Sequence, residues 1–436
     1  MAEFKAADRY DNLWLWFLGV PTSPRPVGQL QLVEPGKGVS LQYDPSWLDG
    51  GFALSEDLPL VDLDQQPRDK GLAAGAVDDA RPDRWGERVI QFLDKPRRLS
   101  LMEYLYLAGD DRFGALGVST SPDNYQPRRA SPLPRLEDAQ QLSDIVAKIN
   151  ARQQVSDMER RMMHAGGSFG GAKPKALIQI DGTQWVIKFF NGEPVDVPLI
   201  EHASMTLAAK AQIRVATTMP VRLAGEHAVA VQRYDRVGAN RVHCISAGTA
   251  LRAIAPSNNS LDFGYPNLAQ LLRRAGDTRH DANRNDMAEL FRRMVFNILI
   301  DNTDDHEKNH TLMFTRHDRE ARMRLTPAYD VLPTNSGQGR QEFVVGDAAG
   351  DSTLANAMSQ CEQFGLERDQ AAQQVLQVIA VVDGWKEHFR VVGVTDGDVQ
   401  SLAERLDVGD LGAQRTDFKP QNYKNKNTRR RQGPFA

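Results

Sequence analysis

The order in which apolar patterns follow one another along the chain limits the folds that it can adopt. Up to residue 236, segments such as GQLQLVE and VSLQYD alternate apolar and polar residues, as half-buried strands do. From about residue 245 the chain becomes mainly helical. There DMAELFRRMVFNILI repeats apolar residues at i, i+3, i+4 and i+7, with Asp286 placed to cap it. Strands and helices segregated in this way predict an α+β fold.

Shifts in composition divide the 436 residues, which are enough for about two or three domains. Residues 119–135 hold four prolines and little apolar material, so they predict a linker. The last 25 residues hold seven Lys or Arg against one acid. We therefore expect a small β-rich N-terminal domain, a linker, a β-containing lobe, a helical lobe and a flexible basic tail, at residues 1–118, 119–135, 136–236, 237–411 and 412–436 respectively.

Charge and cysteine content indicate which partners and which cellular compartment to expect. The net charge of −4 gives no overall bias toward nucleic acid. The two cysteines, Cys244 and Cys361, are too few for a disulfide framework and fit a reducing cytosol. Charged residues precede the first apolar run, which argues against a signal peptide, and the longest apolar runs are too short to span a bilayer. We expect a cytoplasmic protein without a membrane partner.

The segment DNTDDHEKNH, residues 301–310, combines four acids, two histidines and two asparagines without an aliphatic side chain. Two motifs overlap in it. Residues 306–310 match HExxH, the zinc-protease signature. Asp304 and Asn309 have the five-residue spacing that separates the aspartate and asparagine of a kinase catalytic loop. A solvated polar loop without a chemical role is the third interpretation.

The zinc interpretation requires a helix, because HExxH binds zinc only when both histidines lie on one helical face, one turn apart. No apolar stripe supports a helix through residues 301–310, and the following TLMF resembles a strand. No well-placed third ligand is evident after His310. The sequence therefore disfavours a zinc protease.

Phosphoryl transfer makes demands that the sequence meets better. It needs a carboxylate to accept the proton of the attacking hydroxyl, and hard oxygen ligands for Mg²⁺. Asp304 is the candidate base, with Asp305 as the second choice, and Asn309 is a candidate metal ligand. Asp330, in RLTPAYDVLPT, lies 26 residues after Asp304 and is the candidate second ligand. The alternative for Asp330 is a plain Asx turn.

The segment upstream of this loop has elements that fit ATP. AGGSFGGAKPK (165–175) is glycine-rich, but Ala172 stands where a Walker A motif requires lysine. Asp181-Gly182 predicts a β-hairpin turn. Lys188 lies on the strand after it, and Glu201, on the next helix, is the possible partner of that lysine. This order of loop, strand lysine, helix glutamate, hinge strand and helical lobe predicts a bilobal, protein-kinase-like core.

The residues also resemble a known family. SFGGAKPKALI, VIKFF, VQRYDR, TDDHEKNHTLMF and RLTPAYD resemble the HipA family of bacterial serine/threonine kinases, which are toxins of toxin–antitoxin modules. VGQLQL, SLQYDPSWL and DDRFGAL resemble the small N-terminal domain of that family. The resemblance covers nearly the whole chain except the basic tail.

The resemblance implies a role for each matching residue. Asp304 would be the catalytic base, and Asn309 and Asp330 would bind Mg²⁺. The residues implied in ATP binding are Gly167, Ser168, Gly170, Gly171, Ala172, Lys175, Lys188, Gln232, Tyr234, Asp235 and His306. Ser168 matches the loop serine that the family phosphorylates on itself, and a phosphate there would add negative charge where the ATP phosphates are expected.

The family also implies partners. It suggests a protein substrate such as an aminoacyl-tRNA synthetase, with growth arrest as the outcome. It suggests a small helix-turn-helix antitoxin, through which the protein would meet DNA only indirectly. Two alternatives remain from the residues alone: a small-molecule kinase of related fold, and a non-catalytic, DNA-associated co-repressor subunit whose tail KNKNTRRRQ contacts phosphates.

Overall fold

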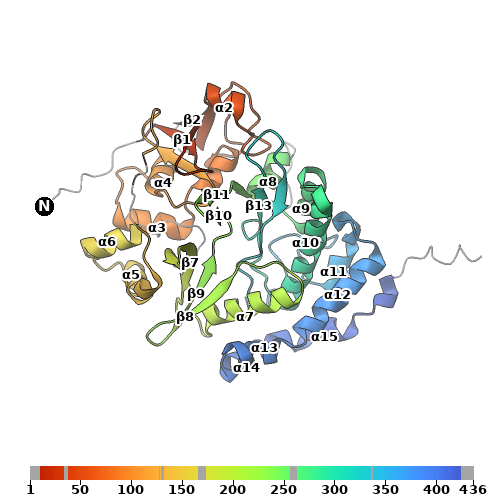
Figure 1. Cartoon of the computed structure of the whole chain (residues 1–436). Coiled ribbons are helices and arrows are strands. Elements are labelled where there is room, and N and C mark those ends of the chain that lie inside the picture. Colours follow the sequence, from red (N-terminus) through yellow and green to blue (C-terminus); the bar gives the residue numbers. More distant parts are fainter. Residues whose placement is uncertain are drawn as a thin grey trace, which may run out of the picture. The chain divides into compact units, whose positions relative to one another are not determined.

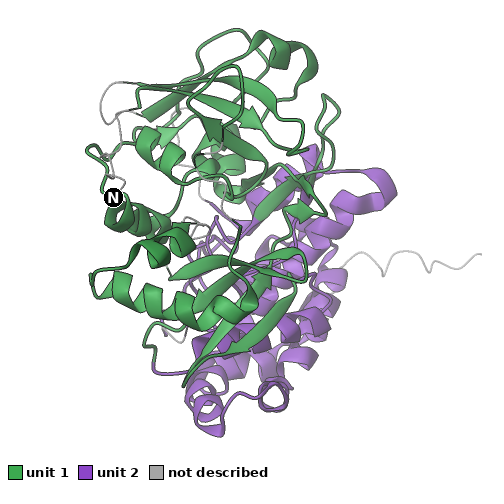
Figure 2. Ribbon diagram, turned by 60° about the vertical axis from the view of Figure 1, so that its left-hand side comes forward, with its two compact units in different colours: residues 1–193, 216–259, 311–323 green, residues 194–215, 260–310, 324–436 purple. Residues whose placement is uncertain are grey.

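The computed structural model describes residues 10–33, 38–126, 128, 132–164, 173–255, 263–334 and 337–423 (Figure 1). The chain forms two compact units (Figure 2). Unit 1 comprises Met1–Glu193, Ala216–Asn259 and Thr311–Met323, and unit 2 comprises Pro194–Val215, Ser260–His310 and Arg324–Ala436. Strands predominate among the elements of unit 1 and helices among those of unit 2, which confirms the predicted α+β class.

The N-terminal part of unit 1 is a five-stranded sheet in the order β4-β3-β2-β1-β5. Its strands are β1 (Asn12–Phe17), β2 (Arg25–Leu32), β3 (Gly38–Tyr43), β4 (Leu72–Ala73) and β5 (Leu116–Ser119). All pairings are antiparallel except β3 with β4. The helical elements of this region are α2 (Pro45–Gly50), η1 (Gly75–Ala80), α3 (Arg84–Leu93) and α4 (Leu101–Leu107).

A second sheet in unit 1 has the order β6-β7-β9-β8 and is antiparallel throughout. Its strands are β6 (Lys175–Ile180), β7 (Thr183–Phe189), β8 (Thr218–Arg222) and β9 (His227–Gln232). Asp181 and Gly182 have φ of 47° and 78°, so they form the predicted tight turn between β6 and β7. The helical elements near this sheet in sequence are η2 (Leu136–Asp138), α5 (Ala139–Asn150) and α6 (Asp157–His164).

One apolar core joins this second sheet to its helices. Leu142 and Ile145 of α5 pack in the same cluster as Ile178 of β6 and Ile187 of β7, together with Trp85 of α3. Further along the chain, the short strands β10 (Arg236–Val237) and β11 (Asn240–Arg241) pair with each other, and β12 (Cys244–Ser246) pairs with β13 (Thr311–Phe314). The helix α8 (Ala247–Ile254) follows β12. The strand β14 (Met323–Leu325) lies where the chain passes from unit 1 to unit 2.

Unit 2 is built around α10, whose Leu290, Phe291 and Met294 are fully buried. This helix contacts α9 and α12. The helices of unit 2 are α7 (Val197–Lys210), α9 (Tyr265–Ala275), α10 (Ala282–Leu299), α11 (Leu354–Ser359), α12 (Arg368–Val382), α13 (Trp385–Val392), α14 (Asp396–Leu406) and α15 (Gly409–Asp417), with the short turns η3 (Arg279–Asp281), η4 (Cys361–Phe364) and η5 (Pro420–Tyr423).

Two local expectations are wrong. Asp286 does not cap α10, because the helix begins at Ala282 and Asp286 lies within it, 1% exposed. The segment from residue 412 is not a flexible tail throughout, because α15 continues to Asp417 and η5 follows. Arg415 anchors α15 through ion pairs with Asp383 and Asp407. Residues 424–436 lie outside the described residues.

Two further observations concern the cysteines and the membrane. Cys244 and Cys361 are both buried free thiols, as their number suggested. In the part of the chain that the structure describes, no helix is both long and apolar enough to cross a membrane.

Candidate active site

The acidic segment 301–310 is an irregular loop that follows α10 in unit 2. The helix ends at Leu299, and Asp301 takes a left-handed conformation with φ of 57°. Asn302 N then donates to Asn297 O at 2.9 Å, which closes the end of the helix. On the other side, Thr334 Oγ1 donates to Asp301 O at 2.8 Å and lies 2.6 Å from Thr303 Oγ1. The loop is therefore fixed at its start.

This conformation does not suit a zinc protease. Residues 306–310 are not helical, so His306 and His310 do not lie one turn apart on a helix face. His310 Nε2 is instead 2.8 Å from the Asp305 carboxylate. Within the described ranges, no group of three His, Cys, Asp or Glu side chains is placed to hold a metal ion. The HExxH pattern in the sequence therefore does not form the helical zinc-binding motif.

The two adjacent aspartates of the loop have different surroundings. Asp304 is exposed, whereas Asp305 is only 2% exposed. Asp305 Oδ2 accepts hydrogen bonds from the Tyr265 hydroxyl and from His310. A general base must reach the proton that it removes. Asp304 is exposed to solvent and stays the predicted base, whereas Asp305 is bonded to partners inside the protein.

Asn309 turns back toward Asp304. Its Nδ2 donates to Asp304 O at 3.4 Å, and its backbone N donates to His306 O at 2.9 Å. In this orientation the amide nitrogen of Asn309 is bonded within the loop. His306 Nδ1 accepts from Lys308 N at 3.1 Å, so the turn between Asp304 and Asn309 is closed by its own groups.

The segment that carries Asp330 lies beside this turn within unit 2. Asp330 is half-buried and has φ of 58°. The neighbouring Tyr329 donates its hydroxyl to Lys308 O at 2.6 Å. A cavity of about 10 Å³ has both segments in its wall, which includes Asn309, Tyr329 and Val331. The structure therefore brings together the two predicted metal-binding segments, which are 21 residues apart in sequence.

Buried acids on α10 hold the start of the Asp330 segment. Asp286 accepts from Arg324 Nε at 2.6 Å and from Leu325 N at 3.0 Å. Arg214 also donates to Asp286, at 2.7 Å. Two turns further along the helix, Arg293 donates to Thr326 O at 2.6 Å. Ion pairs and backbone hydrogen bonds thus tie the chain just before TPAYD to α10, because each buried charge needs a partner.

Unit 1 carries the two lysines predicted to bind nucleotide. Lys175 on β6 and Lys188 on β7 are partners directly opposite each other in the antiparallel register. Both are buried, at 6% and 8% exposure. The position of Lys175 is fixed further by Trp85 Nε1, which donates to Lys175 O at 2.8 Å.

In the predicted hinge segment, VQRYDR (231–236), the Asp235 carboxylate does not have the role that we expected. The Asp235 carboxylate accepts from Arg233 at 2.8 Å, from Arg236 at 3.0 Å and from Gly114 N at 2.8 Å. Despite its burial, the arginines hold the pKa of Asp235 far below its ordinary value. This carboxylate ties the hinge to the N-terminal part of unit 1, so it is not available to a ribose. Sequence reasoning missed the tie because Gly114 is 121 residues away.

The other predicted site residues stand as follows. Gln232 and Tyr234 are half-buried at the end of β9, and Tyr234 packs edge-on against Phe113. Glu201 is buried on α7 of unit 2, whereas Lys188 belongs to unit 1, so their pairing stays a prediction. Five predicted residues lie outside the described residues, namely Gly167, Ser168, Gly170, Gly171 and Ala172.

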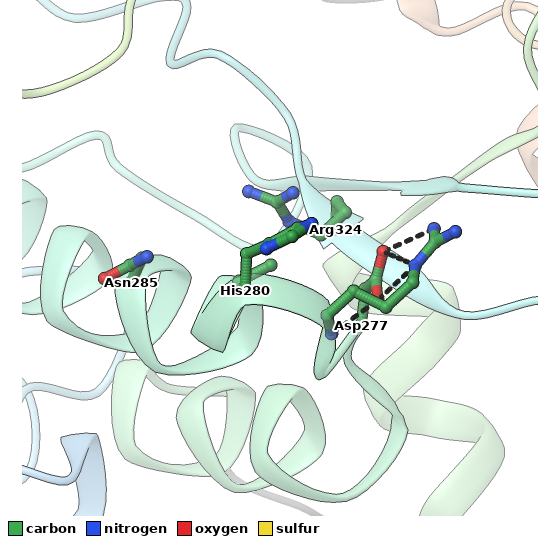
Figure 3. A pocket seen from close by; sticks show the side chains of 6 residues that line it. Asp277, His280, Asn285 and Arg324 are labelled. Atoms are coloured by element: carbon green, nitrogen blue, oxygen red, sulfur yellow. Dashed lines mark hydrogen bonds and ion pairs between the residues drawn. The ribbon is translucent and has the colours of Figure 1, made fainter.

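A separate pocket of about 300 Å³ opens at the start of α10 (Figure 3). It is lined by Asp277, Arg279, His280, Ala282, Asn285 and Arg324. Arg279 donates through Nη2 to Asp277 at 2.7 Å, which neutralises that part of the wall. None of the predicted catalytic or nucleotide-binding residues lines this pocket.

Comparison with protein families decides the relationship of the chain. Residues 167–385 match the model described as HipA-like C-terminal domain, and residues 18–119 match the HipA N-terminal domain. The chain belongs to the HipA family. The interval between the two HipA matches, residues 120–166, contains all but the first residue of the proline-rich segment 119–135. There Tyr125 packs against Trp16, with 6.0 Å between ring centroids.

Individual proteins and solved structures are also similar to this chain. HipA of Shewanella oneidensis MR-1, solved with HipB and its operator DNA, has the same fold with a TM-score of 0.64. The two chains are 15% identical, and the match covers 93% of this chain and 97% of that one. A Sinorhizobium fredii protein named "Putative kinase Y4dM" is 30% identical over 165 residues, which is 35% of this chain and 38% of the relative's length. A Helicobacter pylori kinase, CtkA, is a looser likeness, with a TM-score of 0.42.

Proposed function

We propose that this HipA family member is an ATP- and Mg²⁺-dependent serine/threonine protein kinase and the toxin of a toxin–antitoxin pair. One observation carries the proposal. The loop after α10 exposes Asp304 while Asn309, five residues on, lines a cavity shared with the segment of Asp330. Phosphoryl transfer requires a base and oxygen ligands for a metal ion, and Asp304, Asn309 and Asp330 are proposed to supply them.

In this proposal Asp304 acts on the acceptor hydroxyl. The oxygen of a serine or threonine attacks the γ-phosphorus of ATP, and the bond from that phosphorus to the bridging β–γ oxygen breaks. The hydroxyl proton passes to the Asp304 carboxylate, and the electron pair of the broken bond leaves on ADP. Proton transfer by a positioned side chain typically contributes about 10²–10⁴ in rate.

The chemistry of Asn309 and Asp330 suits Mg²⁺. Asp330 offers a carboxylate, and the hydrogen bond from Asn309 Nδ2 to Asp304 O leaves the amide oxygen of Asn309 as a ligand. Hard oxygen donors of this kind are the ligands that Mg²⁺ prefers. When bound, the ion would neutralise charge on the phosphates. Asn309 and Asp330 would hold it, and the anchoring of their segments keeps both in place.

The nucleotide is proposed to bind through unit 1. Lys175 and Lys188 would contact the phosphates, since both are cationic and they are register partners on neighbouring strands. Gln232 and Tyr234 are proposed to hold the adenine end, without the Asp235 carboxylate. His306 is proposed to lie near the nucleotide. The glycine loop would supply backbone N–H groups to the phosphates.

Regulation and partners extend the proposal. Autophosphorylation of Ser168 would place about −1.5 to −2 charge in the phosphate loop and oppose ATP binding. The Shewanella HipA was solved with HipB and operator DNA. By analogy, we propose that a small helix-turn-helix antitoxin binds this chain and links it to DNA. A translation component, such as an aminoacyl-tRNA synthetase, is the proposed protein substrate.

The test is phosphate transfer from labelled ATP, measured with protein acceptors from a bacterial lysate and with small-molecule acceptors in parallel. Asp304→Asn should lose about 10²–10⁴ of the rate. Glu307→Gln is the matched control, because it removes one acid from the same loop and should remain active. Transfer only to small molecules would overturn the protein-kinase assignment. Transfer that survives in Asp304→Asn would overturn the role of that residue.

A further inference from the structure

We propose that Asp305, His310 and Tyr265 form a buried brace that sets the distance between Asp304 and Asn309, which makes them positioning residues of the proposed phosphotransfer reaction. The inference rests on the proposed function for its catalytic consequence. Its structural part concerns unit 2 alone and can be tested separately. In this proposal the exposed side of the loop, with Asp304, meets the substrate. Its buried side, with Asp305 and His310, fixes the geometry.

The hydrogen bonds of the brace are all internal. His310 Nε2 donates to Asp305 Oδ2 at 2.8 Å, and the Tyr265 hydroxyl donates to the same oxygen. Tyr265 in turn accepts from Asn297 Nδ2 at 3.1 Å, and Asn297 Oδ1 accepts from Asn302 Nδ2 at 3.1 Å. All five side chains are buried. The chain of bonds runs from the end of α10, through the first residue of α9, into the loop.

Ring packing supports the same three residues. Phe343 lies parallel to His310, with centroids 5.1 Å apart and 25° between the planes. Tyr265 meets both rings edge-on, at 4.9 Å from Phe343 and 5.2 Å from His310. The Phe343 backbone N donates to Asp305 O at 3.0 Å. Asp305 is thus held by its side chain and by its backbone, and His310 is held on its face and at its Nε2.

The spacing of the residues explains why this brace acts on the predicted chemistry. Asp305 follows Asp304 directly, and His310 follows Asn309 directly. The pair that is bonded and the pair that would react therefore have the same separation of five residues. Because the hydrogen bond between Asp305 and His310 joins the two ends of this turn, it also limits the distance between the backbones of Asp304 and Asn309. A precise site requires reacting residues whose positions are fixed by the packing and hydrogen bonds of neighbouring buried residues.

One feature of His310 argues that it does more than fill space. His310 Nδ1 is buried and has no hydrogen-bond partner among the described residues. A buried polar atom without a partner costs stability, whereas a phenylalanine would pack on Phe343 without that cost. Retaining an imidazole here is therefore explained by the bond that its Nε2 makes with Asp305. At this position the imidazole lowers stability but fixes the loop geometry, which is a trade-off typical of functional sites.

The first readout of the test is the mobility of the loop. Amide hydrogen exchange of the peptide spanning residues 301–311 is compared between wild type, His310→Phe and the control His388→Phe. His388 is another histidine of unit 2, partly buried and 2.9 Å from Thr206 Oγ1 through its Nε2. We expect faster exchange in the loop of His310→Phe alone. Exchange at the wild-type rate in that variant would overturn the brace, whether or not the protein is a kinase.

The second readout is kinetic and applies the brace to catalysis. With Mg²⁺ and ATP, His310→Phe should lower kcat by about 10- to 100-fold, as small displacements of reacting groups do. It should raise the Mg²⁺ concentration needed for half-maximal rate and leave KM for ATP nearly unchanged. His310→Gln, which keeps an N–H donor, should recover part of the rate. Equal losses in His310→Phe and His388→Phe would show a general loss of stability and overturn the positioning role.

The two proposals fail in distinguishable ways. If wild type and Asp304→Asn are alike in transferring no phosphate, the proposed function is wrong and the exchange experiment alone judges the brace. If wild type is active and Asp304→Asn is not, the function stands. A normal kcat and Mg²⁺ dependence in His310→Phe would then overturn the inference by itself.

Discussion

Asp304 and Asp305 are neighbours in the chain, yet one carboxylate faces solvent and the other is sealed inside unit 2 against Tyr265 and His310. The difference follows from the turn of the loop, in which Asp305 O is bonded to Phe343 N and Asp304 O accepts the Asn309 amide. The outer carboxylate is the proposed base, and the inner one is the proposed fixed point of the loop.

The first prediction concerns the stability of these neighbours. Asp305→Ala leaves the Tyr265 hydroxyl and His310 Nε2 buried without an acceptor, so we expect it to lower the free energy of unfolding by about 2–4 kcal/mol. Asp304→Ala should change it by less than about 0.5 kcal/mol, as exposed substitutions do. Denaturant unfolding of both variants checks this. Equal effects would show that the burial difference is not real.

A second prediction concerns Asp286, which joins three donors of unit 2. Asp286→Ala should destabilise the protein by about 2 kcal/mol, because Arg214 and Arg324 are partly exposed and recover water while Leu325 N loses its acceptor. Asp281→Asn, at the exposed start of α10, is the control and should be near neutral, because asparagine tolerates the left-handed conformation of this position. Phosphate transfer should also fall in Asp286→Ala, because the segment leading to Asp330 loses its anchor. Unaltered transfer would show that this anchor does not serve the site.

A third prediction follows from the buried His243 of unit 1. Burial lowers its pKa from 6.5 to about 4, so the folded protein keeps it neutral while the unfolded chain protonates it below 6.5. Because the unfolded state binds more protons, this contribution is present above pH 6.5 and is lost as the pH falls toward 4. The full loss is about 3 kcal/mol.

The measurement for His243 is the free energy of unfolding of wild type and His243→Gln between pH 4 and pH 7. Burial of Asp79 raises its pKa to about 6, which acts in the opposite direction over the same range. The difference between the two proteins removes that common effect. The wild type should lose stability more steeply on acidification than the variant, and parallel curves would contradict the assignment.

The fourth prediction addresses nucleotide binding. Lys188→Met should weaken ATP binding by about 10- to 100-fold, since a hydrogen bond to a charged group contributes about 1.5–3 kcal/mol. Lys148→Met is the control, because Lys148 pairs with Glu159 on the surface of unit 1. Titration calorimetry with Mg²⁺ and ATP compares the two. Equal affinities would remove Lys188 from the proposed site.

Local patterns predicted much of this molecule. The β6–β7 turn and the body of α10 were predictable, because a hairpin turn and an amphipathic helix are specified by neighbouring residues. The start of α10 was not, since its first turn is polar and carries no apolar stripe. That shift of four residues converts Asp286 from a cap into a buried anchor.

The parts of the site that could not be predicted depend on distant partners. Asp235 was expected to contact nucleotide, but its role is decided by Gly114, which lies 121 residues before it. Tyr265 was not singled out at all, although it is bonded to Asp305 40 residues later. The repeated five-residue spacing of Asp304 to Asn309 and Asp305 to His310 was visible in the sequence. It is the one signal from which the buried side of the loop follows.

The most direct measurement is the intact mass of the purified protein after incubation with Mg²⁺ and ATP, beside Asp304→Asn, with a lysate labelled in parallel. We predict that wild type gains one phosphate, located at Ser168, or labels a lysate protein, and that Asp304→Asn does neither. An equal gain in Asp304→Asn, or no transfer to any protein by the wild type, would contradict the account.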